Sequence, residues 1–295
     1  MSKEASGRQH GPSASRRSGE SVAPGRFKFR EPRVDDRRVS TATVLPHQAR
    51  GSQSELMAWA RYWEWERAVK VELPRLVAQG GIQIWFQPIF RLQPEIPIAD
   101  GFEALSRFPM HPRIPVGLWF RTARDMGIGR ELELAAVRAA MEPLERVSGK
   151  AFLSVNASLE TVPRLVEVIP NPLTNPLIID LPYAALSDPR GGELFDLLRD
   201  CGASIAIDDV PLEDLHVLRP SLLELRPDCI KVDVLTGLAD NPMARFNLAE
   251  GSAWCRGAGI RLIAERVDRV DDLAVLYEVG VEWAQGYCLS RPVLL

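Results

Sequence analysis

Eight short apolar runs follow one another from residue 82 to residue 287, and longer amphipathic segments separate most of them. Short apolar runs are typical of buried strands, and apolar residues at every third or fourth position are typical of helices. Repetition of this pair predicts an α/β protein with a mainly parallel sheet. The predicted strands are 82–90, 98–108, 151–156, 177–181, 204–209, 229–233, 260–264 and 282–287, and the clearest predicted helices are 130–146, 192–201, 242–257 and 271–279.

The link between the first two predicted strands is short, because it consists only of residues 91–97. A parallel crossover needs roughly a dozen residues or more, so this link predicts a hairpin. We therefore expect one antiparallel strand in an otherwise parallel barrel, which is a modified TIM (β/α)8 barrel. The expected domain covers residues 53–295, with a leading helix at 53–80 and the barrel at 81–295.

Residues 1–52 differ in composition from the rest of the chain, with eleven Lys and Arg against five Asp and Glu. Ser, Gly, Pro and Arg dominate this stretch, and neither a helical nor a strand period is visible. Such a segment buries too little apolar surface to order itself, so we expect a disordered tail. Interspersed acids and the absence of interleaved aromatic residues argue against nucleic acid as its partner.

The predicted leading helix carries an apolar stripe with Leu56, Trp59 and Trp63, which Leu73 and Leu76 continue beyond its middle. Aromatic residues at helical spacing usually belong to a core, so we expect this helix to cover the floor of the barrel. The alternative is that the Trp-rich helix forms a homodimer or binds a protein partner.

Several protein classes are disfavoured by what the sequence lacks. We find no run of about 18 apolar residues and no secretory signal pattern, so we expect no membrane span and a cytoplasmic protein. The four cysteines are scattered without a C-x-x-C pair, which favours reduced thiols over zinc ligands or disulfides.

Acidic and amide side chains recur at the carboxyl ends of the predicted strands. In a parallel barrel these ends meet at one mouth, and hard oxygen ligands in such a cluster suit Mg²⁺ or Mn²⁺. Together they predict a metal-dependent enzyme. The residues are Glu103, Asn156, Asp180, Asp208, Asp209 and Glu265, with Lys231 among them.

Each of these residues also has a structural interpretation. A lone acid at a strand end can cap a helix or form an ion pair, and Lys231 can simply neutralise Asp233, with which it shares a strand face. Gln285 can simply bond the backbone, and Arg107 can lie at the surface. Several buried acids side by side, however, require a cation, because repulsion and desolvation both oppose them.

Seven ordered motifs resemble those of EAL domains over roughly residues 64–295. One motif match would be weak evidence, but seven in order and spacing are specific. The motifs are Phe86-Gln87-Pro88-Ile89, Gly101-Phe102-Glu103-Ala104-Leu105-Ser106-Arg107, Ser154-Val155-Asn156, Asp208-Asp209, the segment 224–233 around Lys231, Ala264-Glu265-Arg266-Val267-Asp268 and Gln285-Gly286-Tyr287.

The resemblance implies a protein that binds cyclic di-GMP and hydrolyses one phosphodiester bond to give linear pGpG. It also implies two divalent cations, Mg²⁺ or Mn²⁺, which activate water and neutralise charge on the phosphate. The first would be held by Glu103, Asn156, Asp180 and Asp208, and Asp208 would bridge to a second site that includes Asp209.

The remaining roles that the resemblance implies concern water and substrate. Lys231 and Glu265 would act with Asp209 as catalytic residues, because Lys231 would orient or deprotonate the attacking water and Glu265 would complete its shell. Arg107 would contact a substrate phosphate through its forked guanidinium, while Gln87 and Gln285 would lie against the substrate.

The chain departs from the family pattern around the second metal. Asp180 and Tyr183 stand where the family commonly has Glu, and Val210-Pro211 follows the Asp pair where a Phe-Gly pair is usual. Proline fixes φ and removes an N–H donor, so the loop must follow another path. Arg266 and Asp268 replace a usual Gly and Glu. These changes keep a second hypothesis open, namely a cyclic di-GMP receptor or protein-interaction module without catalysis.

Overall fold

The computed structural model of this chain describes residues 53–143, 151–170, 173–234 and 237–294, and side chains from residue 57 onward. The expected disordered tail, residues 1–52, lies outside the described residues. The predicted helix 130–146 lies partly within them, and its structural counterpart ends at Met141.

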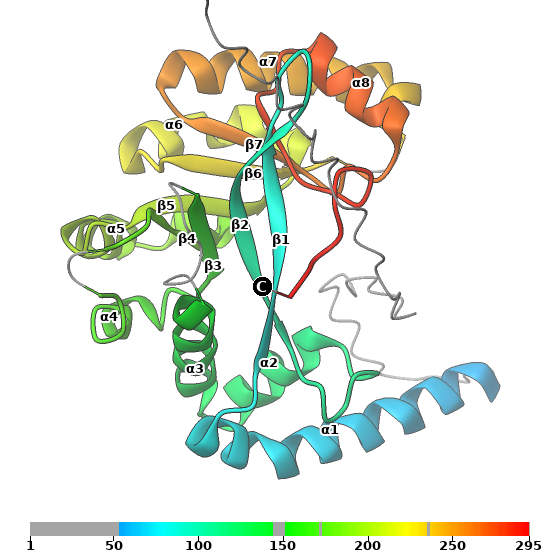
Figure 1. The fold of residues 1–295 in the computed structure, drawn as a ribbon, viewed down its shortest axis with the longest axis vertical. Helices are drawn as coiled ribbons and strands as arrows, with labels where there is room; N and C mark the ends of the chain where they lie inside the picture. The colour runs from blue at the N-terminus through cyan, green and yellow to red at the C-terminus, as the bar shows by residue number, and fades with distance from the viewer. Residues whose placement is uncertain (1–52, 144–150, 171–172, 235–236, 295) are drawn as a thin grey trace, which may run out of the picture. The chain divides into compact units, whose positions relative to one another are not determined.

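The eight strands close into a barrel in sequence order, from β1 to β8 (Figure 1). β1 is antiparallel to both β2 and β8, and every other neighbouring pair is parallel. The predicted modified TIM barrel with one antiparallel strand is thus confirmed. The strands are β1 (Gln83–Arg91), β2 (Ile98–Arg107), β3 (Phe152–Asn156), β4 (Leu177–Pro182), β5 (Ser204–Val210), β6 (Cys229–Asp233), β7 (Arg261–Glu265) and β8 (Trp283–Ala284).

Helices alternate with the strands and bury apolar faces against them. Leu194, Phe195 and Leu198 of α5, for example, occupy one face at helical spacing and join the main core outside the barrel. The helices are α1 (Gln53–Gln79), α2 (Val116–Asp125), α3 (Gly129–Met141), α4 (Val162–Leu165), α5 (Gly191–Asp200), α6 (Leu215–Leu225), α7 (Pro242–Ala258) and α8 (Val270–Glu278).

The barrel interior is layered. Inward side chains near the amino ends of the parallel strands form an apolar layer that includes Phe152, Ile178 and Ile263. Phe152 fits there because its register partner is Gly101, where a Cβ would lie 2.5 Å from the Phe152 ring. Two residues further along each strand the inward side chains become polar, since side chains alternate with a period of two.

The leading helix α1 does not cover the barrel floor, so that expectation was wrong. Its second half buries Val69, Leu73 and Leu76 in a separate cluster with residues of α2 and α3. The chain then enters β1 at Gln83, which pairs with Arg107, the last residue of β2. Because the parallel strands finish at that end of the barrel, α1 stands on the same side as the polar mouth rather than on the floor.

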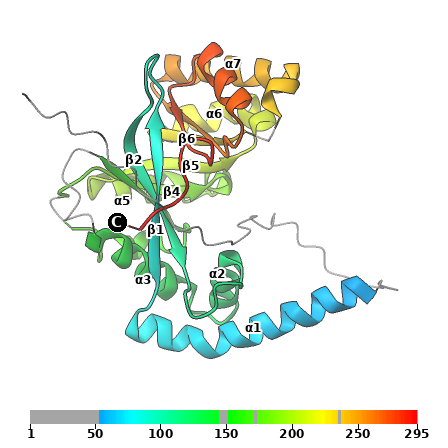
Figure 2. The ribbon, with the colours of Figure 1, turned by 45° about the vertical axis from the view of Figure 1, so that its right-hand side comes forward.

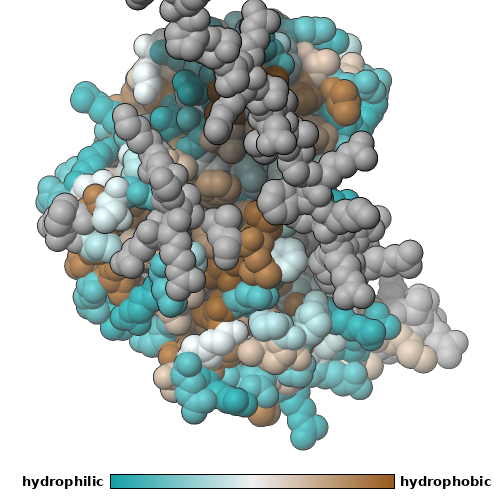
Figure 3. Space-filling model, in the orientation of Figure 1, coloured by the Kyte–Doolittle hydropathy of each residue, from teal (hydrophilic) through white to brown (hydrophobic). Residues whose placement is uncertain are grey.

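The first half of α1 projects past the helices that hold its second half (Figure 2). Trp63 is 61% exposed and Trp59 is 39% exposed, so neither belongs to a core. Hydrophilic residues line much of the lower edge of the face in Figure 3, where α1 and α2 lie.

Among the residues that the structure describes, no helix combines the length and apolar character needed to cross a bilayer.

Candidate metal centre

The parallel register brings the polar residues of successive strands to one end of the barrel. Asn156 of β3 lies opposite Asp180 of β4, and Asp233 of β6 lies opposite Glu265 of β7. Glu103 of β2 pairs with Ser154, two residues before Asn156 on the same face of β3. Glu103, Ser154, Asp180 and Glu265 are almost completely buried, whereas Asn156 is exposed. Buried polar groups require hydrogen-bond or charged partners, which the neighbouring side chains of the cage supply.

Lys231 lies at the centre of this cage and is completely buried. Burial by itself lowers its pKa, but the surrounding carboxylates outweigh that effect and raise the pKa well above the usual range. The side chain therefore stays protonated. Its Nζ lies 2.9 Å from Asp180 Oδ2, 3.1 Å from Glu265 Oε1, 3.8 Å from Asp208 Oδ1 and 3.9 Å from Glu103 Oε1.

Asp180 experiences opposing effects. Burial raises the pKa of its carboxyl to about 7, and the nearby Asp208 and Glu103 add to the rise, whereas Lys231 and the Ser154 hydroxyl oppose it. Ser154 Oγ donates a hydrogen bond of 2.6 Å to Asp180 Oδ1. Among the described residues, four carboxylates surround one ammonium, an arrangement that suits the uptake of a divalent cation.

A chain of amide hydrogen bonds fixes Glu103 from both sides. Asn156 Nδ2 donates to Glu103 Oε1 at 3.0 Å, and Gln285 Nε2 donates to Glu103 Oε2 at 2.6 Å. Gln285 also donates to Gln87 Oε1 at 3.1 Å, and Gln87 Nε2 donates to the Ser290 carbonyl at 3.2 Å. The carboxylate is therefore held with its lone pairs oriented before any ligand arrives.

A β-bulge near the end of β5 places two consecutive acids at the mouth. The register advances by three positions on β5, from Ile207 to Val210, but by only two on β6, from Ile230 to Val232. Asp209 adopts the left-handed region with φ 53°, which aspartate tolerates better than most residues. Regular alternation would send Asp208 and Asp209 to opposite faces.

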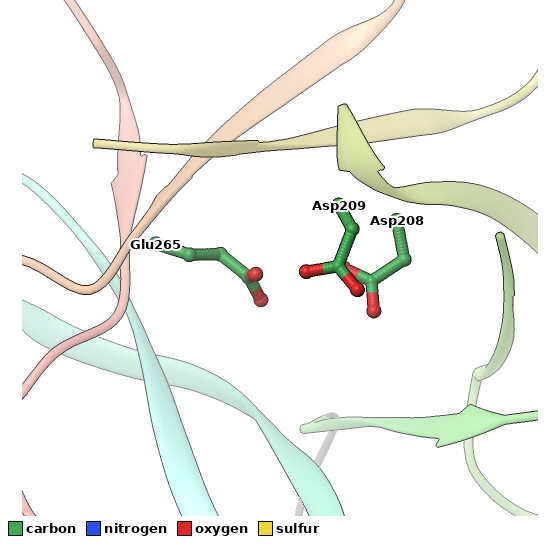
Figure 4. A group of neighbouring side chains, drawn as sticks. All are labelled: Asp208, Asp209 and Glu265. Carbon is green, nitrogen blue, oxygen red and sulfur yellow. The ribbon is translucent and has the colours of Figure 1, made fainter. Parts of the chain in front are cut away.

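Carboxylate oxygens of Asp208, Asp209 and Glu265 all lie within 4.8 Å of one another. In Figure 4, Glu265 reaches from β7 toward the two aspartates on β5. Such a group of hard oxygen atoms can hold a divalent cation. Asp209 lies at the exposed rim of this group, whereas Asp208 and Glu265 are buried.

Arg266 follows Glu265 directly and also has left-handed backbone, with φ 56°. Its Nη1 lies 2.7 Å from Asp233 Oδ2, and its Nη2 lies 3.8 Å from Asp209 Oδ1. Asp233, considered from the sequence as a partner for Lys231, thus forms an ion pair with Arg266 instead.

The loop after β8 carries Gln285 to the cage through a close backbone approach. The Gln285 N–H donates to the Ala264 carbonyl at 2.8 Å, and the Val267 N–H donates to the Gln285 carbonyl at 3.1 Å. A Cβ on Gly286 would lie 2.2 Å from the Val267 carbonyl oxygen, so only glycine fits. Asp268 secures the same loop by accepting the Tyr287 N–H at 2.9 Å.

The structure brings most of the predicted site residues together. Glu103, Asn156, Gln87 and Gln285 form one hydrogen-bonded group, and Lys231 joins Glu103 to the acids. Arg107 lies apart from that group, at the final position of β2, where its Nη1 donates to the Ser106 carbonyl at 3.0 Å. Tyr183 is 42% exposed, in the turn after β4.

Two residues of the site had no role in the sequence prediction. Ser154 was quoted only as part of a motif, although strand alternation places it two residues before Asn156 on the same face. Arg266 was noted only as a replacement for glycine, because its contacts depend on a left-handed backbone that a side-chain pattern does not predict.

Comparison with known proteins identifies related sequences. An EAL domain profile matches residues 70–292. The chain is 28% identical over 245 residues to the uncharacterized protein y4lL of Sinorhizobium fredii, covering 76% of this chain and 28% of that protein. It is 32% identical over 105 residues to the cyclic di-GMP phosphodiesterase PdeB of Shewanella oneidensis, covering 35% of this chain and 12% of that protein. The chain thus spans less than a third of the length of either relative.

The fold is similar to that of the FimX EAL domain of Xanthomonas citri, solved in complex with c-diGMP. The TM-score is 0.67 at 17% sequence identity, and the match covers 83% of this chain and 98% of that one. At this level of sequence identity, the similarity shows a shared fold alone.

Proposed function

The chain belongs to the EAL domain family, and on that premise we propose that it binds cyclic di-GMP and hydrolyses one phosphodiester bond to give linear pGpG. The observation that carries the proposal is the buried cage in which Glu103, Asp180, Asp208 and Glu265 surround Lys231. A structural ion pair needs one acid for one base. Four acids around one lysine instead suit a site that takes up further positive charge.

The donor set fits Mg²⁺ or Mn²⁺. The close carboxylate oxygens of Asp208, Asp209 and Glu265 are hard ligands, and Glu103 and Asn156 add a carboxylate and an amide. Glu103, Asn156, Asp180 and Asp208 would hold the ion, with Asp209 at its rim. When bound, a divalent cation lowers the pKa of water and neutralises charge on the phosphate.

Lys231 acts in this proposal as a fixed hydrogen-bond donor. Because the carboxylates hold its pKa well above the usual range, the ammonium keeps its protons at neutral pH. In this protonated form it can orient a water molecule by donating a hydrogen bond. Asp180 and Glu265, each within 3.1 Å of Nζ, keep the ammonium in place.

Gln87, Gln285 and Arg107 are proposed to contact the substrate. Gln285 and Gln87 lie beside Glu103 through hydrogen bonds, where they can accept or donate to a phosphate or base edge. Arg107 lies four residues beyond Glu103 on the same strand, at roughly 13 Å by strand geometry, where a forked guanidinium can bind a phosphate.

The test is a steady-state assay of cyclic di-GMP with Mn²⁺, in which chromatography separates substrate and pGpG. We expect metal-dependent product from the wild type and a loss of about 100-fold or more in Glu103→Gln, because even residues that only support a metal ligand cost about 10–100-fold. Glu278→Gln is the matched control, since Glu278 forms an exposed ion pair with Arg245 on the outer helices. Equal rates for all three proteins would contradict the proposed role of Glu103.

The second candidate function is a receptor that binds cyclic di-GMP without cleaving it. The altered segment Val210-Pro211 and the ion pairs of Arg266 favour it, because the segment directly follows Asp209 and Arg266 pairs with Asp209. Calorimetry on the same preparation separates the two functions. Binding of cyclic di-GMP without pGpG formation supports the receptor, and absence of binding with or without Mn²⁺ rules out both.

A further inference from the structure

Two residues at the mouth of the barrel share an unusual backbone conformation. Asp209 and Arg266 have φ of 53° and 56°, and each directly follows a buried acid of the cage, Asp208 or Glu265. Left-handed backbone at a non-glycine residue is strained and persists only where the surroundings hold it. Here an ion pair links the two strained residues directly.

The Arg266 guanidinium lies between two carboxylates. Nη1 is 2.7 Å from Asp233 Oδ2, and Nη2 is 3.8 Å from Asp209 Oδ1. A guanidinium does not lose its proton in proteins, so this positive charge is permanent. Its planar fork also lets one side chain serve two carboxylates at once.

The same Asp209 belongs to the group of three carboxylates that can hold a divalent cation. A cation that takes Asp209 as a ligand at the rim must compete with the guanidinium for that carboxylate. It must also approach a fixed positive charge only a few ångströms away. Arg266 forms its ion pairs with Asp209 and Asp233, whereas Glu103, Asp180 and Asp208 contact Lys231. The competition from the guanidinium therefore falls on the rim of the cage.

We propose that Arg266 takes the place of a second divalent cation at the rim, so that each chain binds one cation in the cage. The inference rests on the proposed function, since it assumes that the cage binds a divalent cation at all. In this arrangement the guanidinium supplies a single positive charge at the mouth, and a guanidinium can bind a phosphate through its forked donors.

Arg226 provides a matched control within the same chain. It also has left-handed backbone, with φ 50°, and its side chain is exposed at the end of α6. It precedes β6 and therefore lies at the opposite end of the barrel from the cage. Arg226→Gly thus removes the same side chain and relieves the same kind of strain without touching the site.

The experiment counts Mn²⁺ bound per chain by equilibrium dialysis and by electron paramagnetic resonance of free Mn²⁺, using full-length wild type, Arg266→Gly and Arg226→Gly. Glycine adopts positive φ readily, so both variants should keep their backbone, which circular dichroism checks. We expect one Mn²⁺ per chain in the wild type and in Arg226→Gly, and two in Arg266→Gly.

Equal counts in the wild type and Arg266→Gly would overturn the inference, as would two ions in the wild type. If the wild type binds Mn²⁺ and cleaves cyclic di-GMP while the counts stay equal, only the role of Arg266 fails. If the wild type binds no Mn²⁺, the proposed metal-dependent function fails with it.

Discussion

Asp180 reports on the charge state of the whole cage. Its carboxyl touches both the Lys231 ammonium and the Ser154 hydroxyl, yet burial raises its pKa to about 7, aided by Asp208 and Glu103. In the metal-free protein at acid pH this residue therefore carries a proton. The shorter Asp in place of the family's usual Glu still reaches Lys231, at 2.9 Å.

The pKa of Asp180 predicts a pH-dependent stability. In the unfolded chain the carboxyl loses its proton near its ordinary pKa of 3.8, whereas burial in the folded protein raises the pKa to about 7. Between these values the folded state binds more protons, so the free energy of unfolding falls as pH rises. We expect urea unfolding in EDTA to show the wild type losing stability relative to Asp180→Asn from pH 4 to pH 7. A constant difference across that range would contradict this account.

At the residue scale, sequence reasoning predicted which acids lie together where a motif and strand alternation agreed, and their roles stay predictions. Glu103, Asp208 and Glu265 follow apolar runs in a fixed order, so their convergence is a consequence of topology alone. The ion pairs of Arg266 were beyond such reasoning, because they depend on left-handed backbone at two separate strand ends.

At the scale of an element, the segment after β8 also has contacts that sequence patterns did not predict. This segment positions Gln285 through backbone hydrogen bonds with the residues that follow β7, and Gly286 permits the contact. The motif Gln285-Gly286-Tyr287 was identified from sequence. The sequence does not explain why the middle residue is glycine. The structure does, because the backbone of Gly286 approaches the backbone of Val267 too closely for a Cβ atom.

Gly286→Ala should destabilise the protein by about 1–3 kcal/mol, because the added methyl group would overlap the Val267 backbone and force it to move. Displacement of Gln285 would also weaken its hold on Glu103. Chemical unfolding measures the stability, and Mn²⁺ titration measures the effect on the cage.

Gly257→Ala is the control for that substitution. Gly257 lies in α7 with open space around its Cβ position, so alanine there should leave stability unchanged or raise it by about 0.5–1 kcal/mol. If both variants unfold at the same denaturant concentration as the wild type, the close approach at Gly286 is not a constraint on the fold.

Strands were predicted more accurately than helices. Predicted and observed strand bounds agree within a few residues, because buried parallel strands are apolar runs bounded by turns. The sequence prediction did not specify α2 or α6; α2 is only ten residues long, and Pro220 interrupts the helical pattern of α6. The predicted position of α1 on the barrel floor was wrong, because an apolar stripe predicts that a helix is buried but not which neighbours it packs against.

At the scale of the whole molecule, the order of the strands explains why the site exists. Closure of the barrel places residues from β2 to β7, together with the loop after β8, at one mouth, although they are spread over more than half of the chain. The resemblance to EAL domains gave the expected fold and ligand chemistry. The two proposed functions, hydrolysis and binding without cleavage, differ in what they require of the rim, where Pro211 and Arg266 depart from that pattern and Arg266 pairs with Asp209.

The most direct test of the central claim is a single-turnover reaction with the protein in excess over cyclic di-GMP, run with Mn²⁺ and in parallel with EDTA. Excess protein makes even slow cleavage visible, because every substrate molecule can be bound. The cage predicts conversion of cyclic di-GMP to pGpG with Mn²⁺ and none with EDTA. Unchanged cyclic di-GMP in the presence of Mn²⁺, on a preparation shown to bind the nucleotide, would contradict hydrolysis at this site.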